Sequence, residues 1–188
     1  MNLATHQRAM LQLIRSPGEV PVFDDAYLSM VAHSTDLQEA RHNVFLWRAY
    51  VLERTAPLTF NLLKRRRLLK AELDTYIALH NLSPFRETHA PVFLDQLSAH
   101  ADPLVARVAQ FERALHRVRY GDTRCYSIPW DGDPLPLLTN LAKDEPFDEE
   151  CDGVAHVIVV ARDQPGFFDV RLEMAAVSRP DSPSRMEN

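Results

Sequence analysis

Glycine is scarce in this chain and unevenly distributed. Five glycines occur among 188 residues, and none lies in the 102 residues from 19 to 120. Glycine weakens the interior of a helix and is favoured in turns. The gap therefore predicts a long helical part that ends near Gly121. The glycines from Gly121 onward predict a turn-rich part after it.

Cysteine and long apolar segments are also nearly absent. The two cysteines, Cys125 and Cys151, form no CxxC pair and are too few for a disulfide framework, which favours a reduced, intracellular setting. The N-terminal residues lack the continuous apolar core of a signal peptide. The longest strongly apolar run, 154–161, is too short to span a bilayer. We therefore expect a cytoplasmic protein with no membrane partner.

Basic and acidic residues are divided unequally between the two parts of the chain. Residues 1–121 hold 15 basic and 12 acidic side chains, whereas residues 122–188 hold 6 basic and 14 acidic ones. We accordingly divide the chain into a helical domain (1–121), a β-rich region (122–175) and a tail (176–188). The tail has the composition of a disordered segment.

Apolar residues at steps of three and four predict helices through most of the first part. In the segment that opens at Asp36 these residues form a stripe that we expect to be buried: Leu37, Ala40, Val44, Trp47 and Val51. Pro57, shortly after Thr55, indicates the start of another helix. The other expected helices cover 4–15, 24–33, 57–82, 89–99 and 103–120.

The helix over 103–120 has the clearest boundaries. Asp102 is a typical N-cap, Pro103 fits the first helical position, and Gly121 fits the position after the last turn. Its inward stripe is expected to be Leu104, Val108, Phe111, Leu115 and Val118. Glu112 and His116 are spaced to pair on the flank of this helix. We interpret it as structural scaffold and not as a site.

After Gly121 the apolar period changes from 3.6 to 2, which predicts strands over 124–129, 154–162 and 167–174. In the last of these, Phe168, Val170, Leu172 and Met174 alternate with Phe167, Asp169, Arg171 and Glu173. The acidic, proline-rich connection between the first two strands is expected to hold one helical turn. The predicted fold class is α+β, with an N-terminal bundle of about six helices followed by a small antiparallel β-sheet.

No catalytic motif or closely spaced metal-ligand cluster occurs in the sequence. His80, His89 and His100 lie in three different predicted segments, and a stand-alone metalloenzyme would require them to converge. We therefore expect no catalytic residue, no metal site and no cofactor on this chain.

One basic cluster is the single indication of polyanion binding. It comprises Lys64, Arg65, Arg66, Arg67 and Lys70. Its charges are spread around a helix, the chain is acidic overall, and no aromatic residues are interleaved, so a solvated helix face is the favoured interpretation. The alternative function is a DNA-binding regulatory protein that uses this 64–70 segment.

The helical part resembles the N-terminal domain of HvfC/BufC-type proteins over about residues 2–120. The matching features are a proline followed by "LL", then "YIALH" (76–80), "FLDQL" (93–97) and a closing helix with Phe111, Glu112, Ala114 and Leu115. The basic run replaces the glycine that usually follows "LL". These are mainly helix-packing residues, so the resemblance identifies a fold better than a site.

The resemblance implies a non-catalytic partner subunit. Such proteins form heterodimers with multinuclear non-haem iron oxidative enzymes, which modify cysteines of ribosomally made precursor peptides. The iron is then expected on the partner enzyme, and a nucleic-acid partner is not expected. Short members with a compact β-rich C-terminus resemble the partner subunits of 3-thiaglutamate and methanobactin biosynthesis, and we favour the 3-thiaglutamate type. A DNA-binding description of the family's domain supplies the alternative function.

A leader peptide of variable sequence is best held by main-chain hydrogen bonds at an open sheet edge. The predicted strands offer such edges, and Pro129 suits an edge strand. The expected peptide-binding residues are Arg124, Tyr126, Ile128, Phe167, Asp169, Arg171 and Glu173.

Overall fold

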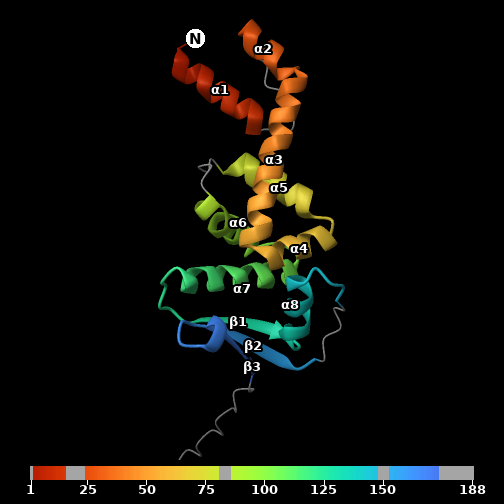
Figure 1. Cartoon of the computed structure of the whole chain (residues 1–188), viewed down its shortest axis with the longest axis vertical. Helices are drawn as coiled ribbons and strands as arrows, with labels where there is room; N and C mark the ends of the chain where they lie inside the picture. The colour runs from red at the N-terminus through yellow and green to blue at the C-terminus, as the bar shows by residue number, and fades with distance from the viewer. Residues whose placement is uncertain (1, 16–23, 81–85, 148–152, 174–188) are drawn as a thin grey trace, which may run out of the picture.

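The computed structural model describes residues 2–15, 24–80, 86–147 and 153–173. Within these residues the chain forms helices followed by a small antiparallel sheet, which confirms the predicted α+β class (Figure 1). The helices before the sheet are α1 (Leu3–Arg15), α2 (Ala26–Ala32), α3 (Thr35–Thr55), α4 (Pro57–Arg65), α5 (Leu69–Leu79), α6 (His89–Leu97) and α7 (Pro103–Arg119), with the 3₁₀ turn η1 (Arg86–Thr88) before α6. The later elements are β1 (Tyr126–Asp131), α8 (Pro134–Ala142), β2 (Ala155–Val160), η2 (Pro165–Phe167) and β3 (Phe168–Leu172).

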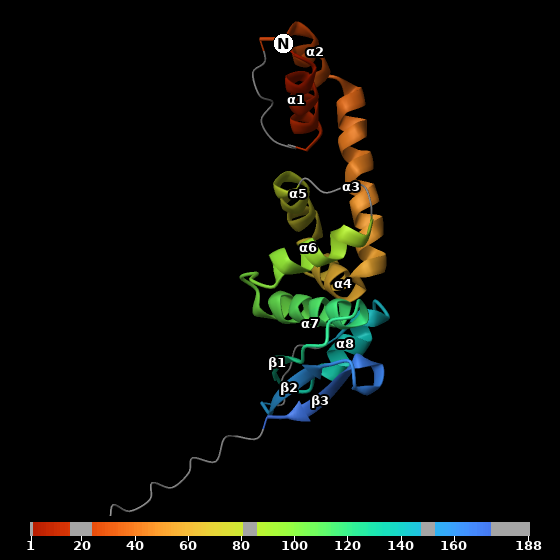
Figure 2. The same ribbon diagram turned by 90° about the vertical axis from the view of Figure 1, so that its left-hand side faces the viewer.

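Two hydrophobic cores are joined by the long helix α3, which runs along one side of the molecule (Figures 1 and 2). The smaller core contains Leu13, Leu28, Ala32 and Leu37, from α1, α2 and the start of α3. The larger core extends from the second half of α3 to the sheet. Helix α3 therefore connects a small N-terminal unit to the main body.

The predicted buried stripe of α3 is wrong at Trp47, whose surface is 45% exposed. Leu37 and Val51 are buried as expected. Apolar residues occur on more than one face of this helix, so the periodicity did not identify the packed face. Trp47 instead stacks on Tyr50, with ring centroids 6.0 Å apart.

The helix predicted over 57–82 is interrupted, and α4 ends at Arg65 before α5 begins at Leu69. Arg67 adopts a left-handed conformation with φ of 59°. The backbone N–H of Leu68 donates to the carbonyl of Leu63 at 2.9 Å, as in a helix-terminating Schellman motif. Because that conformation favours glycine, an arginine at this position conceals the helix end in the sequence.

The acidic connection between β1 and β2 contains more structure than the single helical turn expected. Asp133 caps α8 by accepting a hydrogen bond from the backbone N–H of Leu135 at 2.9 Å. Pro134 occupies the first turn, where a missing N–H costs little. Leu137, Leu138 and Leu141 are buried, and α8 packs against α4.

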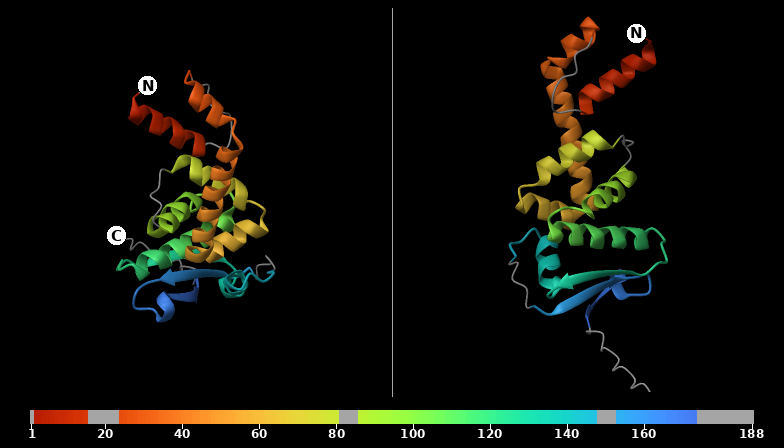
Figure 3. Two further views of the ribbon diagram at one scale, coloured as in Figure 1. Left: turned by 45° about the horizontal axis from the view of Figure 1, so that its top comes forward. Right: turned by 180° about the vertical axis from the view of Figure 1, so that it is seen from behind.

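Helix α7 lies across the inner face of the sheet, between the sheet and helices α4 and α6 (Figures 1 and 3). The strand order is β1-β2-β3, with both pairs antiparallel, so β1 and β3 are the edge strands. Strand β1 continues past Pro129 to Asp131, beyond the predicted end. The inner face buries Ile128, Trp130, Ile158 and Val160.

The predicted boundaries of α7 are confirmed. The carboxylate of Asp102 accepts a hydrogen bond from the backbone N–H of Leu104 at 2.9 Å, and Gly121 follows the helix with φ of 100°. The predicted stripe is buried at Val108, Phe111, Leu115 and Val118, and Leu104 packs partly buried against the same core. The expected disordered tail, 176–188, and Cys151 lie outside the described residues. None of the described helices combines the length and apolar character needed to cross a membrane.

Candidate functional site: the free edge of strand β3

Two hydrogen bonds at the ends of β3 determine which of its backbone groups face β2. The N–H of Glu173 donates to the carbonyl of Ala155 at 2.8 Å, and the N–H of Ala161 donates to the carbonyl of Phe167 at 3.0 Å. Every second residue of an antiparallel strand faces the same neighbour. Asp169 and Arg171 therefore direct their backbone groups to β2. The backbone groups of Phe168, Val170 and Leu172 face the free edge.

The free edge of β1 is less suited to receive another strand. The N–H of Gly132 donates to the carbonyl of Val154 at 2.9 Å, so the backbone groups of Ser127, Pro129 and Asp131 face away from β2 by the same alternation. Pro129 has no N–H and sits in the middle of this row. Proline on an edge strand is a common protection against unwanted strand addition. Strand β3 has no such interruption.

The side chains of β3 differ between the two faces of the sheet. On the outer face Arg171 Nε lies 2.9 Å from Asp169 Oδ2, and the side chains of Arg171 and Glu173 are exposed. On the inner face Phe168 packs edge-to-face on Phe111, with ring centroids 5.2 Å apart. Leu172, at the end of that face, is 62% exposed. A strand added along β3 would bury this apolar side chain and would also lie beside the Asp169–Arg171 pair.

The predicted peptide-binding residues are divided between the two edges. Asp169, Arg171 and Glu173 lie together at β3, whereas Arg124, Tyr126 and Ile128 lie at or before β1. Because β2 separates the two edge strands, their axes are about 10 Å apart. Ile128 is only 4% exposed, so its side chain packs in the core and does not reach an added peptide.

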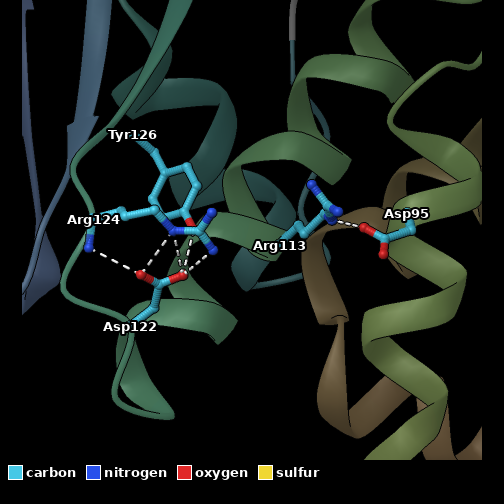
Figure 4. A network of polar contacts seen from close by, with 5 residues as sticks. All are labelled: Asp95, Arg113, Asp122, Arg124 and Tyr126. Carbon is cyan, nitrogen blue, oxygen red and sulfur yellow. Dashed lines mark hydrogen bonds and ion pairs between the residues drawn. The ribbon is translucent and has the colours of Figure 1, made fainter.

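Arg124 and Tyr126 take part in a local network of hydrogen bonds with Asp122, which orients the chain just before β1 (Figure 4). Arg124 Nη2 lies 2.6 Å from Asp122 Oδ2, and the Tyr126 hydroxyl donates to the same oxygen at 2.6 Å. These hydrogen bonds from Arg124 and Tyr126 hold the pKa of Asp122 well below its usual range. Nearby, Arg113 of α7 pairs with Asp95 of α6.

The prediction that Phe167 belongs to the alternating strand is wrong. It lies in η2 with φ of 72°, and its ring packs partly buried against the main core. A left-handed residue cannot continue a strand, so the chain turns at Phe167 and β3 begins at Phe168. No local signal predicts this turn, since phenylalanine is an unusual residue for that conformation.

The backbone donors of Phe168, Val170 and Leu172 were not among the predicted site residues. The mixed polar face was the predicted binding face of the strand. Alternation in the sequence identifies which side chains share a face. It does not identify which backbone groups remain unpaired, because that depends on the register with β2. The proline of β1 was the one relevant signal, since it disfavours the competing edge.

The predicted pair of Glu112 and His116 is wrong. Glu112 is buried, and its two carboxylate oxygens accept hydrogen bonds from the backbone N–H groups of Leu58 and Thr59 at 2.8 Å each. Burial raises the pKa of Glu112 to about 7, although these hydrogen bonds oppose the shift. His116 instead stacks on Tyr120, with ring centroids 4.5 Å apart. Glu112 therefore joins α7 to the start of α4.

The three histidines of the metalloenzyme alternative have separate partners. The Tyr76 hydroxyl lies 2.9 Å from Nδ1 of buried His89, whereas His80 Nε2 lies 3.2 Å from Gln96 Oε1. His100 Nε2 lies 3.4 Å from Glu72 Oε1. Within the described ranges, no group of three His, Cys, Asp or Glu side chains is placed to hold a metal ion.

The basic 64–70 segment is largely engaged in ion pairs. Lys64 and Arg65 contact Asp144 at 2.8 and 3.3 Å, Arg66 contacts Asp102 at 3.3 Å, and Lys70 contacts Asp74 at 2.5 Å. These carboxylates neutralise much of the charge that a phosphate backbone would require. The structure therefore provides no support for the DNA-binding alternative.

No protein-family model, curated protein or solved structure matches this chain. The feature with the clearest chemical meaning is the uninterrupted free edge of β3.

Proposed function

We propose that this chain is a non-catalytic partner subunit that binds the leader of a ribosomally made precursor peptide. It presents the peptide to an iron-dependent oxidative enzyme, with which it forms a heterodimer. The resemblance of the helical part to HvfC/BufC-type proteins supports this role, and the 3-thiaglutamate type is favoured over the methanobactin type. The chemistry belongs to the partner enzyme, which carries the iron.

The observation that carries the proposal is the row of unpaired backbone groups at Phe168, Val170 and Leu172. A peptide that pairs with this row gains main-chain hydrogen bonds whatever its sequence. Selectivity then comes from the neighbouring side chains. The exposed Leu172 favours an apolar residue in the peptide, and the charged outer face favours polar residues at alternate positions.

Purified alone, the chain is expected to hold no stoichiometric metal and to modify no peptide. Modification should begin when an iron-dependent oxidative enzyme of the proposed partner class is added together with its precursor peptide. Metal analysis and mass spectrometry of the peptide measure both outcomes. Tight iron binding and peptide modification by this chain alone would refute the proposal.

A proline in place of Val170 is expected to weaken precursor-peptide binding by about tenfold or more, because it removes one free-edge donor and obstructs the approach of a strand. The N–H of Val170 faces away from β2, so the sheet keeps its own hydrogen bonds. Isothermal titration calorimetry measures the affinity of the folded variant for the precursor peptide, and circular dichroism verifies that the variant is folded.

Two matched variants make this result specific. Arg171→Pro removes a donor that faces β2, so it should lower the stability of the sheet as well. Ser127→Pro removes a free-edge donor of β1 and should leave the affinity for the peptide unchanged. If Ser127→Pro abolishes binding while Val170→Pro does not, the peptide lies along β1 and the choice of edge is wrong.

A further inference from the structure

A pocket of about 440 Å³ opens between the last turn of α3, the start of α4 and the last turns of α7. Its volume falls within the range typical of ligand-binding pockets. The lining residues that matter for its chemistry are Arg54, Glu112, Leu115, His116, Arg119 and Tyr120. This pocket lies on the helical part of the molecule and is separate from the edge of β3.

The pocket carries an excess of positive charge. Arg54 and Arg119 both line it, and neither forms an ion pair with another described residue. Glu112 is the one carboxylate among the lining residues, and both of its oxygens already accept backbone hydrogen bonds. Burial, together with the charge of Arg119, lowers the pKa of His116, which favours its neutral form at pH 7. Arg119 also acts electrostatically on Glu112 and lowers the pKa of that carboxyl. Because neither guanidinium is held in an ion pair among the described residues, both can still bind an anionic group.

Exposed aromatic rings extend this pocket along both helices. On α3, Trp47 stacks on Tyr50, and the guanidinium of Arg54 lies 4.7 Å from the centre of the Tyr50 ring. On α7, Tyr120 stacks on His116 and is 75% exposed. Trp47 and Tyr50 are 45% and 47% exposed, so both rings reach the surface of α3. Figure 2 shows α3 running along one side of the molecule with no described helix beyond it. Tryptophan, tyrosine and arginine are the residues that contribute most binding energy at protein interfaces.

We propose that this surface docks a partner protein and that the pocket receives an aspartate or glutamate side chain of that partner. The two arginines bind the carboxylate, and the rings of Trp47, Tyr50 and Tyr120 contact apolar side chains beside it. A protein fits better than a small acid, because the exposed rings continue well beyond the pocket. The identity of this partner rests on the proposed function, in which the partner protein is the iron-dependent enzyme.

The carboxylate preference is testable without the enzyme. The probes are the acetylated and amidated tripeptide Leu-Glu-Leu and its uncharged counterpart Leu-Gln-Leu, each titrated into the ¹⁵N-labelled full chain. Leu-Glu-Leu is expected to shift the amide signals at the ends of α3 and α7. It should also bind about tenfold more tightly than Leu-Gln-Leu, as is typical of a charge-assisted hydrogen bond.

Arg119→Gln should remove this difference between the tripeptides. Arg8→Gln should not, although Arg8 lines another hollow, which is formed by α1 and Ala78 of α5. Equal binding of the two tripeptides, or shifts confined to another surface, would overturn the proposal. Binding of inorganic phosphate as tight as that of Leu-Glu-Leu would also overturn it, because the pocket would then be a general anion site.

A second arm uses the iron-dependent oxidative enzyme of the proposed heterodimer. Arg119→Gln should weaken the complex about tenfold or more and leave the affinity for the precursor peptide unchanged, whereas Arg8→Gln should change neither. A complex that is as tight with Arg119→Gln as with the unaltered chain overturns this inference and leaves the proposed function intact. If the unaltered chain forms no complex, the proposed function fails, and the assignment of this surface to the enzyme fails with it.

Discussion

Replacing Phe111 with alanine is expected to lower the free energy of unfolding by about 3–5 kcal/mol. The Phe111 ring is 2% exposed and packs edge-to-face on Phe168, so it joins α7 to the sheet at β3. Its removal leaves a cavity between α7 and the sheet. The lost stability is the sum of the transfer free energy of the removed ring atoms and the cost of the cavity. Urea denaturation followed by circular dichroism measures the change.

Leu79→Ala is the control for this substitution, because Leu79 is 67% exposed and also lies in a helix. Its effect should stay within about 0.5 kcal/mol. A loss below about 1 kcal/mol for Phe111→Ala would contradict the packing of α7 on the sheet. Because Phe168 begins the proposed peptide-binding strand, we also expect Phe111→Ala to weaken precursor-peptide binding in the protein that remains folded.

Glu112 is expected to make the chain less stable as the pH rises from about 4.5 to about 7. Burial raises the pKa of this carboxyl to about 7 in the folded chain, from an ordinary value of 4.5. Between these two values the unfolded chain loses the proton while the folded chain retains it. Each step upward in pH therefore favours unfolding, and the total loss is about 3 kcal/mol. Above the folded pKa this contribution becomes constant.

Comparison with Glu112→Gln isolates this effect from the other titrating groups. The amide nitrogen of glutamine cannot accept a hydrogen bond from Leu58 or Thr59, so the variant should be less stable at pH 4.5. The difference in unfolding free energy between the two proteins should then shrink as the pH rises to about 7. If the difference in unfolding free energy grows with pH, the hydrogen bonds from the two backbone N–H groups lower the pKa of Glu112 by more than burial raises it.

Local sequence signals were sufficient to locate α7 and the three strands. Asp102, Pro103 and Gly121 define the ends of α7 through interactions with their immediate neighbours, so they can be read without knowledge of the fold. The alternation in 167–174 located β3 because a strand on a core buries every second side chain. Helix α8 was underestimated because its prolines and acidic flanks resemble a loop, although both prolines fall within its first three residues.

The features that could not be predicted from the sequence depend on contacts between distant residues. Glu112 accepts from backbone groups 53 and 54 residues away in the sequence, so its burial left no periodic signal. The free-edge groups of β3 follow from its register with β2. Phe167 was assigned to the strand because its left-handed conformation is rarely adopted by phenylalanine.

Amide hydrogen exchange tests the proposed binding edge most directly. In the free chain the amides of Phe168, Val170 and Leu172 have no strand partner, so we expect them to exchange quickly. A precursor peptide of the proposed class should slow exchange at these three amides and leave exchange at Ser127 and Asp131 of β1 unchanged. Slower exchange at β1 with no change at β3, or no change at either strand with the peptide bound, would contradict the account.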